Sequence, residues 1–251
     1  MTLKDRIVVV TGGATGIGRG AAVCCAKSGA QVVIADLNDE GMGETSHIIE
    51  SQGGLAATVH TDISNESDVE QLMNETAVNY GSIDALINSA GVLEGPFVPL
   101  EDFEECTFDR VVDINLKGSF FAAKHAARHM RRQGGGVVIL ISSGAGVHGG
   151  SSSVAYASSK GGVHGLSLVL RGQLEPLGIR VHCVCPGGIN SPLKLRVIEA
   201  DAVNKGETDE ERAAEVARQA ESLGDPIGVG KVLAFLASDD ADYVRGTMFV
   251  R

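Results

Sequence analysis

Short apolar runs alternate with helical patterns along this chain, and that alternation constrains its fold more than any other feature. Strand-like runs rich in β-branched residues occur at 7–10, 31–35, 56–60, 83–88, 136–141, 179–184 and 247–250. Helical patterns lie between them at 17–28, 41–51, 66–80, 103–132 and 155–177. Continuous apolar strands separated by helices predict parallel strands that are buried on both faces. With right-handed crossovers, the chain is predicted to be α/β: a Rossmann-type doubly wound parallel sheet of about seven strands with helices on both faces.

The chain is expected to form a single domain over residues 1–251, because it contains no linker, low-complexity tract or internal repeat. Residues 187–223 are the one stretch without a regular pattern. They begin with Gly-Gly, carry several apolar residues and turn acidic at 207–211. An insertion beside the carboxyl edge of the sheet is a candidate substrate lid.

Composition excludes several classes of function. The formal net charge of -11 argues against binding to nucleic acid or to an anionic membrane. No apolar run approaches the roughly 20 residues that span a bilayer, and no secretory signal precedes the first strand, so a cytoplasmic protein is expected. The five cysteines lack metal-site spacing, which predicts reduced, mostly buried thiols and no metal.

A glycine-rich turn follows the first predicted strand and opens the first helix. Gly12, Gly16 and Gly18 stand in this turn. A helix N-terminus offers free N–H groups and partial positive charge to a pyrophosphate, and glycine lets the phosphate come close. A plain tight turn is the alternative. The position of the glycine cluster directly after the first strand favours a dinucleotide site.

Asp36 ends the second predicted strand, where an acidic residue is expected to receive the ribose hydroxyls of a dinucleotide. A carboxylate there would repel the 2′-phosphate of NADP. Leu37 follows, and no Lys or Arg compensates. We therefore predict NAD over NADP. The alternative is that Asp36 only caps the loop to the next helix.

Two further segments follow strands, at the edge where open α/β sheets bind ligands. Asp62 and Ile63 follow the third strand, and Asn88, Ala90 and Gly91 follow the fourth. These residues are predicted to contact the cofactor. On their own they would be ordinary loop residues.

Tyr156 and Lys160 are four residues apart on a predicted helix, so they share one face. Tyrosine has an ordinary pKa near 10, and a nearby ammonium favours the phenolate and lowers that pKa. Tyr156 is then the predicted acid and base of a hydride transfer, and Lys160 is also expected to hold the cofactor ribose. Such a pair alone usually lies on a helix surface. Its concurrence with the glycine turn and Asp36 favours catalysis.

Ser143 ends a predicted strand and is expected to hydrogen-bond the reacting substrate oxygen. Asn115 lies inside the helical stretch 103–132. A polar amide in that apolar segment is expected to bend the helix or to hold a water that passes protons from Lys160.

Taken together, the chain resembles the compact single-domain branch of the short-chain dehydrogenase/reductase family over residues 5–250. The matching pieces are 11–18, Asp62-Ile63, 88–91, Asn115, Ser143, 156–160 and Pro186-Gly187. The resemblance implies nicotinamide chemistry on alcohols and ketones with Asn115, Ser143, Tyr156 and Lys160 as catalytic tetrad. It also implies cofactor contacts from Thr15, Ile17, Pro186, Gly187 and Ile189, and a homo-oligomer, usually a tetramer, built on the helices near 103–132 and 155–177.

The chain departs from the family pattern at several positions. Ser89 and Ser191 replace a usual Asn and Thr, and the Ser191 hydroxyl is expected to contact the carboxamide. Gly228 and Gly230 are expected to weaken a late helix. The sequence ends at Arg251, where relatives commonly continue, so an interface near the last strand is expected to differ.

The substrate pocket is expected to be lined by 92–97, 143–150 and 187–198, which are mostly small or apolar and suit a neutral or hydrophobic secondary alcohol or ketone. Ser143, Gly188 and Tyr156 are predicted substrate contacts. His148 either orients a polar substrate group or faces solvent. Lys194 and Arg196 either meet a carboxylate or carrier phosphate or are solvated.

The sequence favours an NAD-dependent oxidoreductase acting on a small-molecule secondary alcohol or ketone. One alternative is a 3-oxoacyl-[acyl-carrier-protein] reductase, which usually uses NADPH, so Asp36 counts against it. The other is a non-catalytic NAD-binding regulator, against which the intact tetrad counts.

Overall fold

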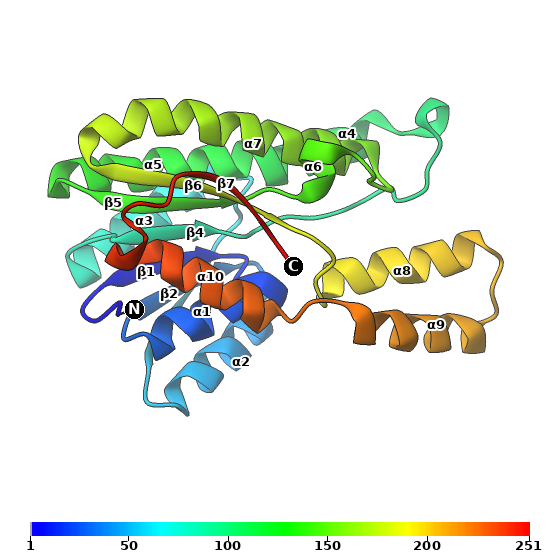
Figure 1. Cartoon of the computed structure of the whole chain (residues 1–251), viewed down its shortest axis with the longest axis horizontal. Helices are drawn as coiled ribbons and strands as arrows, with labels where there is room; N and C mark the ends of the chain where they lie inside the picture. Colours follow the sequence, from blue (N-terminus) through cyan, green and yellow to red (C-terminus); the bar gives the residue numbers. More distant parts are fainter. Residues whose placement is uncertain (1) are drawn as a thin grey trace.

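The computed structural model describes residues 2–251 and shows one α/β domain (Figure 1). Met1, which the predicted domain includes, lies outside the described residues. Seven parallel strands form one sheet in the order β3-β2-β1-β4-β5-β6-β7. They are β1 Ile7–Thr11, β2 Gln31–Asp36, β3 Leu55–His60, β4 Ala85–Asn88, β5 Gly136–Ile141, β6 Ile179–Pro186 and β7 Gly246–Val250. The predicted fold class is confirmed, and each predicted strand is found within two residues of its expected ends.

Helices cover both faces of the sheet. One buried cluster packs α1, α2 and α10 on one face, and a second packs α3, α5 and α7 on the other. The main helices are α1 Gly16–Lys27, α2 Asp39–Glu50, α3 Glu66–Tyr80, α4 Glu105–Val112, α5 Gly118–Gln133, α6 Gly144–His148, α7 Val154–Leu174 and α10 Pro226–Ala237. Because the sheet is buried on both sides, its strands read as continuous apolar runs.

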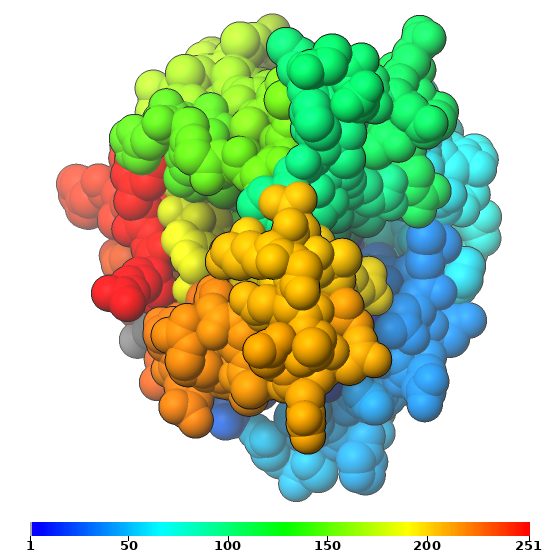
Figure 2. Space-filling model, turned by 90° about the vertical axis from the view of Figure 1, so that its right-hand side faces the viewer, coloured from blue at the N-terminus to red at the C-terminus, as the bar shows by residue number. Residues whose placement is uncertain are grey.

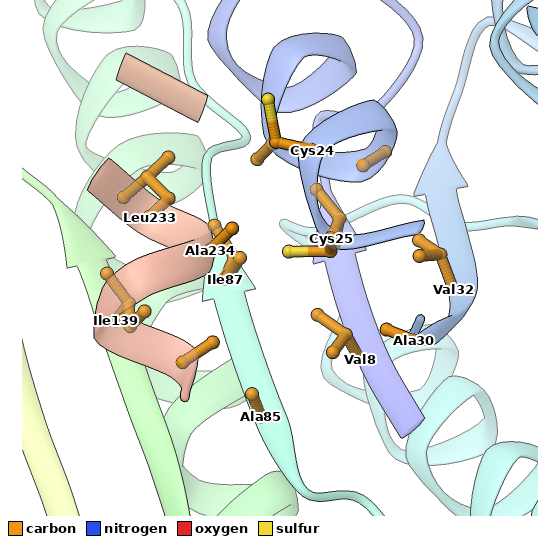
Figure 3. Close-up of a cluster of buried hydrophobic side chains, with 14 of the residues drawn as sticks. Val8, Cys24, Cys25, Ala30, Val32, Ala85, Ile87, Ile139, Leu233 and Ala234 are labelled. Carbon is orange, nitrogen blue, oxygen red and sulfur yellow. The ribbon is translucent and has the colours of Figure 1, made fainter. Parts of the chain in front are cut away.

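One of the two glycines predicted to weaken the late helix, Gly230, has a packing role, whereas Gly228 has nothing within 4 Å of its Cβ position. A Cβ on Gly20 of α1 would lie 2.5 Å from the Pro226 carbonyl oxygen, and one on Gly230 of α10 would collide with the Gly20 backbone. Glycine therefore lets α1 and α10 pack backbone to backbone. Figure 3 shows the core beside this contact, where Cys25, Leu233 and Ala234 meet the strands.

The helix predicted over 103–132 is interrupted. A short 3₁₀ turn at Leu100–Asp102 precedes α4, and a π-helical turn at Asp113–Lys117 separates α4 from α5. Asn115 lies in this turn. Its side chain bonds to the backbone of Val92 rather than to its own helix. The predicted bend or bound water at this amide stays a prediction.

Residues 187–223 are more regular than predicted. They form a helical hairpin of α8 Pro192–Asn204 and α9 Asp209–Ser222, which we call the lid. Figure 2 shows the lid, in yellow and orange, standing in front of one end of the molecule. Two backbone bonds close its stem, from Asn190 N–H to the Gly224 oxygen and from Gly224 N–H to the Gly188 oxygen, both 2.9 Å.

Four of the five cysteines, Cys24, Cys25, Cys183 and Cys185, are buried and free, whereas Cys106 is exposed. Within residues 2–251, no helix has both the length and the apolar character needed to cross a bilayer. The same residues hold no group of three His, Cys, Asp or Glu side chains arranged to ligate a metal.

Candidate active site

A cleft of about 530 Å³ opens at the carboxyl ends of the strands, between the sheet and the first turns of α8. In Figure 1 this is the side on which the lid projects. Segments far apart in the sequence meet here: the glycine turn, the ends of β2 and β4, the start of α6, one face of α7 and the residues after β6. The topology places ligands at this edge in open α/β sheets.

The glycine turn is shaped by backbone contacts. Gly12 has φ +66°, and a Cβ there would lie 2.6 Å from the Ala90 nitrogen. A Cβ on Gly18 would collide with the Gly12 carbonyl, so Gly18 supports the turn from behind and does not line the cleft. Thr15, the N-cap of α1, makes no side-chain capping bond. The first N–H groups of α1 therefore remain available to an anion.

Asp36 lines the cleft at the end of β2, beside Leu37. Its carboxylate accepts one bond from the Ala14 N–H and one from the Asn38 N–H, both 3.1 Å. Asn38, not Asp36, caps α2 through the Gly41 N–H. Asp36 is thus not the N-cap of α2, but its bond to the Asn38 N–H does hold the loop before that helix, so the loop-capping alternative stays open.

Arg19 is the basic side chain of α1 near this site, and it is already bound. Its guanidinium donates to the Ala14 carbonyl oxygen and pairs with Glu44 at 2.6 Å. It is not among the residues that line the cleft. Arg19 is therefore not a free cation beside Asp36.

Most of the other predicted cofactor residues line the cleft, namely Gly12, Thr15, Gly16, Ile17, Asp62, Ile63, Ala90, Gly91, Pro186, Gly187, Ile189 and Ser191. Asn88 does not. It is 2 % exposed and lies beneath the cleft, where it bonds to Thr11 and Ser119. The structure thus assigns Asn88 to the support of the site.

Ser143 and Tyr156 meet at the cleft. Ser143 caps α6 by accepting a bond from the Ala145 N–H at 3.2 Å. Burial raises the pKa of the Tyr156 hydroxyl above its ordinary value, and the hydrogen-bonded Ser143 side chain opposes that rise. The predicted lowering of this pKa by Lys160 is wrong for the chain alone, because the Lys160 ammonium is 5.9 Å from the Tyr156 ring centroid and points elsewhere.

Lys160 is 4 % exposed, and its ammonium donates to the Ile141 carbonyl oxygen at 2.9 Å. Burial lowers the pKa of Lys160 to about 8, while the thiols of Cys183 and Cys185 act in the opposite direction. The ammonium form still predominates at neutral pH. A hydrogen bond of 2.7 Å from the Ser142 hydroxyl to the Lys160 backbone oxygen holds this part of α7 against β5.

Asn115 does not line the cleft but supports it. Its amide nitrogen donates to the Val92 oxygen and the Ser159 hydroxyl, both 2.9 Å, and its oxygen accepts from the Val92 N–H at 2.8 Å. A Cβ on Gly91 would lie 3.0 Å from that oxygen and 3.2 Å from the Lys160 ammonium. The lack of a side chain at Gly91 therefore leaves room for Asn115 and Lys160 on either side of it.

A buried chain of hydrogen bonds continues from Asn115 to the glycine turn. Ser119 donates to the Asn115 backbone oxygen at 2.5 Å and accepts from Asn88 at 2.9 Å, and Asn88 accepts from Thr11 at 2.7 Å. At the other end, Ser159 donates to the Tyr156 backbone oxygen at 2.8 Å. Ser119 was not among the residues predicted for the site. A serine four residues after Asn115, on a buried helix face, was the available signal.

His148 is exposed, and its ring stacks on Phe249 of β7 at 4.7 Å between centroids. It does not line the cleft, whereas the predicted substrate contacts Ser143, Tyr156 and Gly188 do. The lid contributes Leu193, Lys194 and Val197 to the cleft wall. Arg196 instead lines a groove between α8 and α9.

The family model described as short chain dehydrogenase matches residues 6–202. The chain therefore belongs to the short-chain dehydrogenase/reductase family.

Similar proteins match over almost their whole length. Tropinone reductase-like 1 of Erythroxylum coca is 37% identical over 250 residues, which are 99% of this chain and 89% of that protein. Cis-4-hydroxycyclohexanecarboxylate dehydrogenase of Sinomonas cyclohexanicum is 37% identical over 245 residues, 97% and 94% of the two chains. The structure of an NAD⁺-bound xylitol dehydrogenase superposes with a TM-score of 0.89 at 28% identity and covers 100% of this chain and 99% of its own.

Proposed function

We propose that this protein is an NAD-dependent dehydrogenase or reductase that interconverts a secondary alcohol and a ketone. The observation that carries the proposal is the meeting of Ser143, Tyr156 and Lys160 in the same cleft as the glycine turn. A regulator that only bound the dinucleotide would need the turn but not this group.

The bound nicotinamide would supply the hydride acceptor or donor, and the side chains would manage the proton. Tyr156 takes the alcohol proton on oxidation and gives a proton to the ketone oxygen on reduction. Ser143 donates a hydrogen bond to that oxygen and stabilises the charge that develops on it. The positive charge of an oxidised nicotinamide would favour the phenolate of Tyr156, and Lys160 would hold the cofactor ribose.

Asp36 supports NAD as the cofactor. Its carboxylate is oriented by two backbone N–H groups and lies on the cleft wall, so it would accept from ribose hydroxyls and repel a 2′-phosphate. Replacing it tests the assignment. Asp36→Ala should narrow the ratio of NADPH to NADH dissociation constants by about 10-fold or more. An unchanged ratio would remove Asp36 from the ribose site.

The names of two relatives and the lining of the cleft support a substrate class. Two of the relatives above are named for ring compounds, tropinone and cis-4-hydroxycyclohexanecarboxylate. The cleft wall includes the small or apolar side chains of Val92, Leu93, Ala145 and Val197. A compact ring carrying a secondary hydroxyl or ketone fits this wall better than a long charged chain.

We also propose a cytoplasmic homo-oligomer, a tetramer or a dimer. Apolar side chains stand exposed on α5 and α7, including Phe120, Leu168 and Val169. Exposed apolar side chains on two helices support an interface between copies of the chain. Sedimentation of the purified protein tests this assignment, and a monomer at micromolar concentration would contradict it.

Nicotinamide absorbance tests the function directly. Purified protein would be given NADH or NADPH with cyclic ketones, acyclic ketones and an acetoacetyl thioester, and NAD with the matching alcohols. Turnover of cyclic ketones with NADH is expected. Turnover only with NADPH and only on the thioester would replace the proposal with an acyl reductase. Tight NADH binding without turnover would support the regulator.

A further inference from the structure

One cation of the lid faces the cleft. Lys194, in the first turn of α8, is half-buried and lines the cleft with Leu193 and Val197. Its ammonium makes no hydrogen bond or ion pair within residues 2–251, although the chain carries a formal net charge of -11. Partial burial of an unpaired ammonium is unfavourable. None of the described Asp and Glu side chains forms an ion pair with Lys194.

The other charges on the cleft wall are already bound. Arg110 pairs with Glu94 at 2.9 Å, and Lys160 donates to the Ile141 oxygen. Asp36 accepts two backbone N–H groups, and Asp62 accepts from Ser64 at 2.7 Å. Among the described residues that line the cleft, Lys194 is therefore the cation left free to bind an anion.

The diphosphate of a dinucleotide has other donors. The first N–H groups of α1 lack a side-chain cap, and they lie at the glycine turn. In α8, by contrast, the Ser191 hydroxyl accepts from the Lys194 N–H, so the backbone there is already capped. Around Lys194 the cleft wall is apolar, with Leu193 and Val197 as its neighbours on α8.

We propose that Lys194 binds a carboxylate carried by the substrate, away from the oxygen that Tyr156 and Ser143 hold. The substrate class is then a hydroxy or oxo acid, with its alcohol or ketone on a compact ring. This inference rests on the proposed function and adds the charged group that the substrate carries. Lys194 orients the substrate from the lid, while Tyr156 and Ser143 bind the reacting end.

Arg196 provides a matched control. It is a lid cation two residues further along α8, but it is exposed and lines the groove against α9 with Asp209 and Arg212. Lys194→Met and Arg196→Met remove the same unit of charge from the same helix. Only the first removes it from the cleft.

The test compares kcat/KM for cis-4-hydroxycyclohexanecarboxylate and for its methyl ester, with saturating NAD. The wild-type protein should prefer the acid. Because a hydrogen bond to a charged group contributes about 1.5–3 kcal/mol, Lys194→Met should reduce the ratio of acid to ester about 10- to 100-fold. Arg196→Met should keep the wild-type ratio.

A binding measurement keeps the inference testable if neither compound is turned over. Titration of the NADH complex with cyclohexanecarboxylate should give a dissociation constant that Lys194→Met raises at least 10-fold and Arg196→Met leaves within twofold. No acid preference and no carboxylate binding in the wild type would overturn the inference. So would a Lys194→Met variant that weakens NADH binding while the acid-to-ester ratio stays constant, because the lysine would then bind the diphosphate. Failure of the ring hydroxy acid, its ester and all neutral ring alcohols to turn over would instead contradict the proposed function.

Discussion

His182 makes the stability of this fold depend on pH in a way that can be worked out. The side chain is fully buried on β6, its Nδ1 has no hydrogen-bond partner among the described residues, and the Arg180 guanidinium lies 3.5 Å from its Nε2. Burial and then the charge of Arg180 lower the pKa of His182 from 6.5 to about 4. The folded chain therefore resists protonation of a ring that the unfolded chain protonates readily.

The sign follows from linkage. Between pH 6.5 and pH 4 the unfolded state binds a proton that the folded state does not, so the free energy of unfolding falls as the pH falls. With one pKa unit equal to about 1.4 kcal/mol, His182 contributes a loss of about 2 kcal/mol by pH 5 and about 3 kcal/mol by pH 4. Above pH 6.5 both states hold the neutral ring and the contribution vanishes.

Urea unfolding at pH 7, 6, 5 and 4 measures this loss, at one protein concentration because an oligomer makes stability concentration-dependent. The comparison is with His182→Phe, which removes the titrating group and keeps a ring of similar size. The wild type should lose about 2 kcal/mol more than the variant between pH 7 and pH 5. Equal losses in the two proteins would refute the assignment of a neutral, buried His182.

Two other substitutions test the packing and the buried hydrogen bonds. Gly20→Ala should lower the free energy of unfolding, measured with urea, by about 1–3 kcal/mol, because the new methyl group meets the Pro226 carbonyl. The control Gly43→Ala in α2, which has open space around it, should raise it by about 0.5–1 kcal/mol. Equal effects of the two substitutions would contradict the α1–α10 contact. Ser119→Ala leaves Asn88 without its buried acceptor, so it should cost about 1–3 kcal/mol of stability, with kcat falling more than KM rises, while Ser119→Thr restores both. A normal kcat in Ser119→Ala would remove it from the support of the tetrad.

Local sequence patterns were enough to predict the fold and the residues that the fold brings together at one edge of the sheet. The strands are continuous apolar runs. The glycine turn and Ser143 follow a strand, Asp36 ends one, and Tyr156 lies in the first turn of a helix. Parallel topology alone then gathers them at the carboxyl edge of the sheet.

The lid helices were missed although the sequence held their signals. Ser191 followed by Pro192 is an N-cap with proline at the first helical position, and Thr208 with Glu211 forms a capping box. These signals are weak beside the glycines at 187 and 188 and the acidic run at 207–211, which are typical of an irregular loop.

Other features depended on distant contacts that no local pattern reveals. In the π-helical turn, Asn115 bonds to the backbone of Val92, and His148 stacks on Phe249 near the other end of the chain. The direction of the Tyr156 pKa depends on how deeply the hydroxyl is buried and where the Lys160 ammonium points. Spacing along a helix says that two side chains share a face but not where their polar atoms lie.

Replacement of Tyr156 by phenylalanine tests the central claim most directly. The measurements are kcat/KM on a cyclic ketone with NADH and the NADH dissociation constant by fluorescence, with Tyr243→Phe as control because Tyr243 is fully exposed. Tyr156→Phe should lower kcat/KM about 10²- to 10⁴-fold while NADH binding changes little, and the control should match the wild type. Normal turnover by Tyr156→Phe would show that the proton at the reacting oxygen is handled by another group.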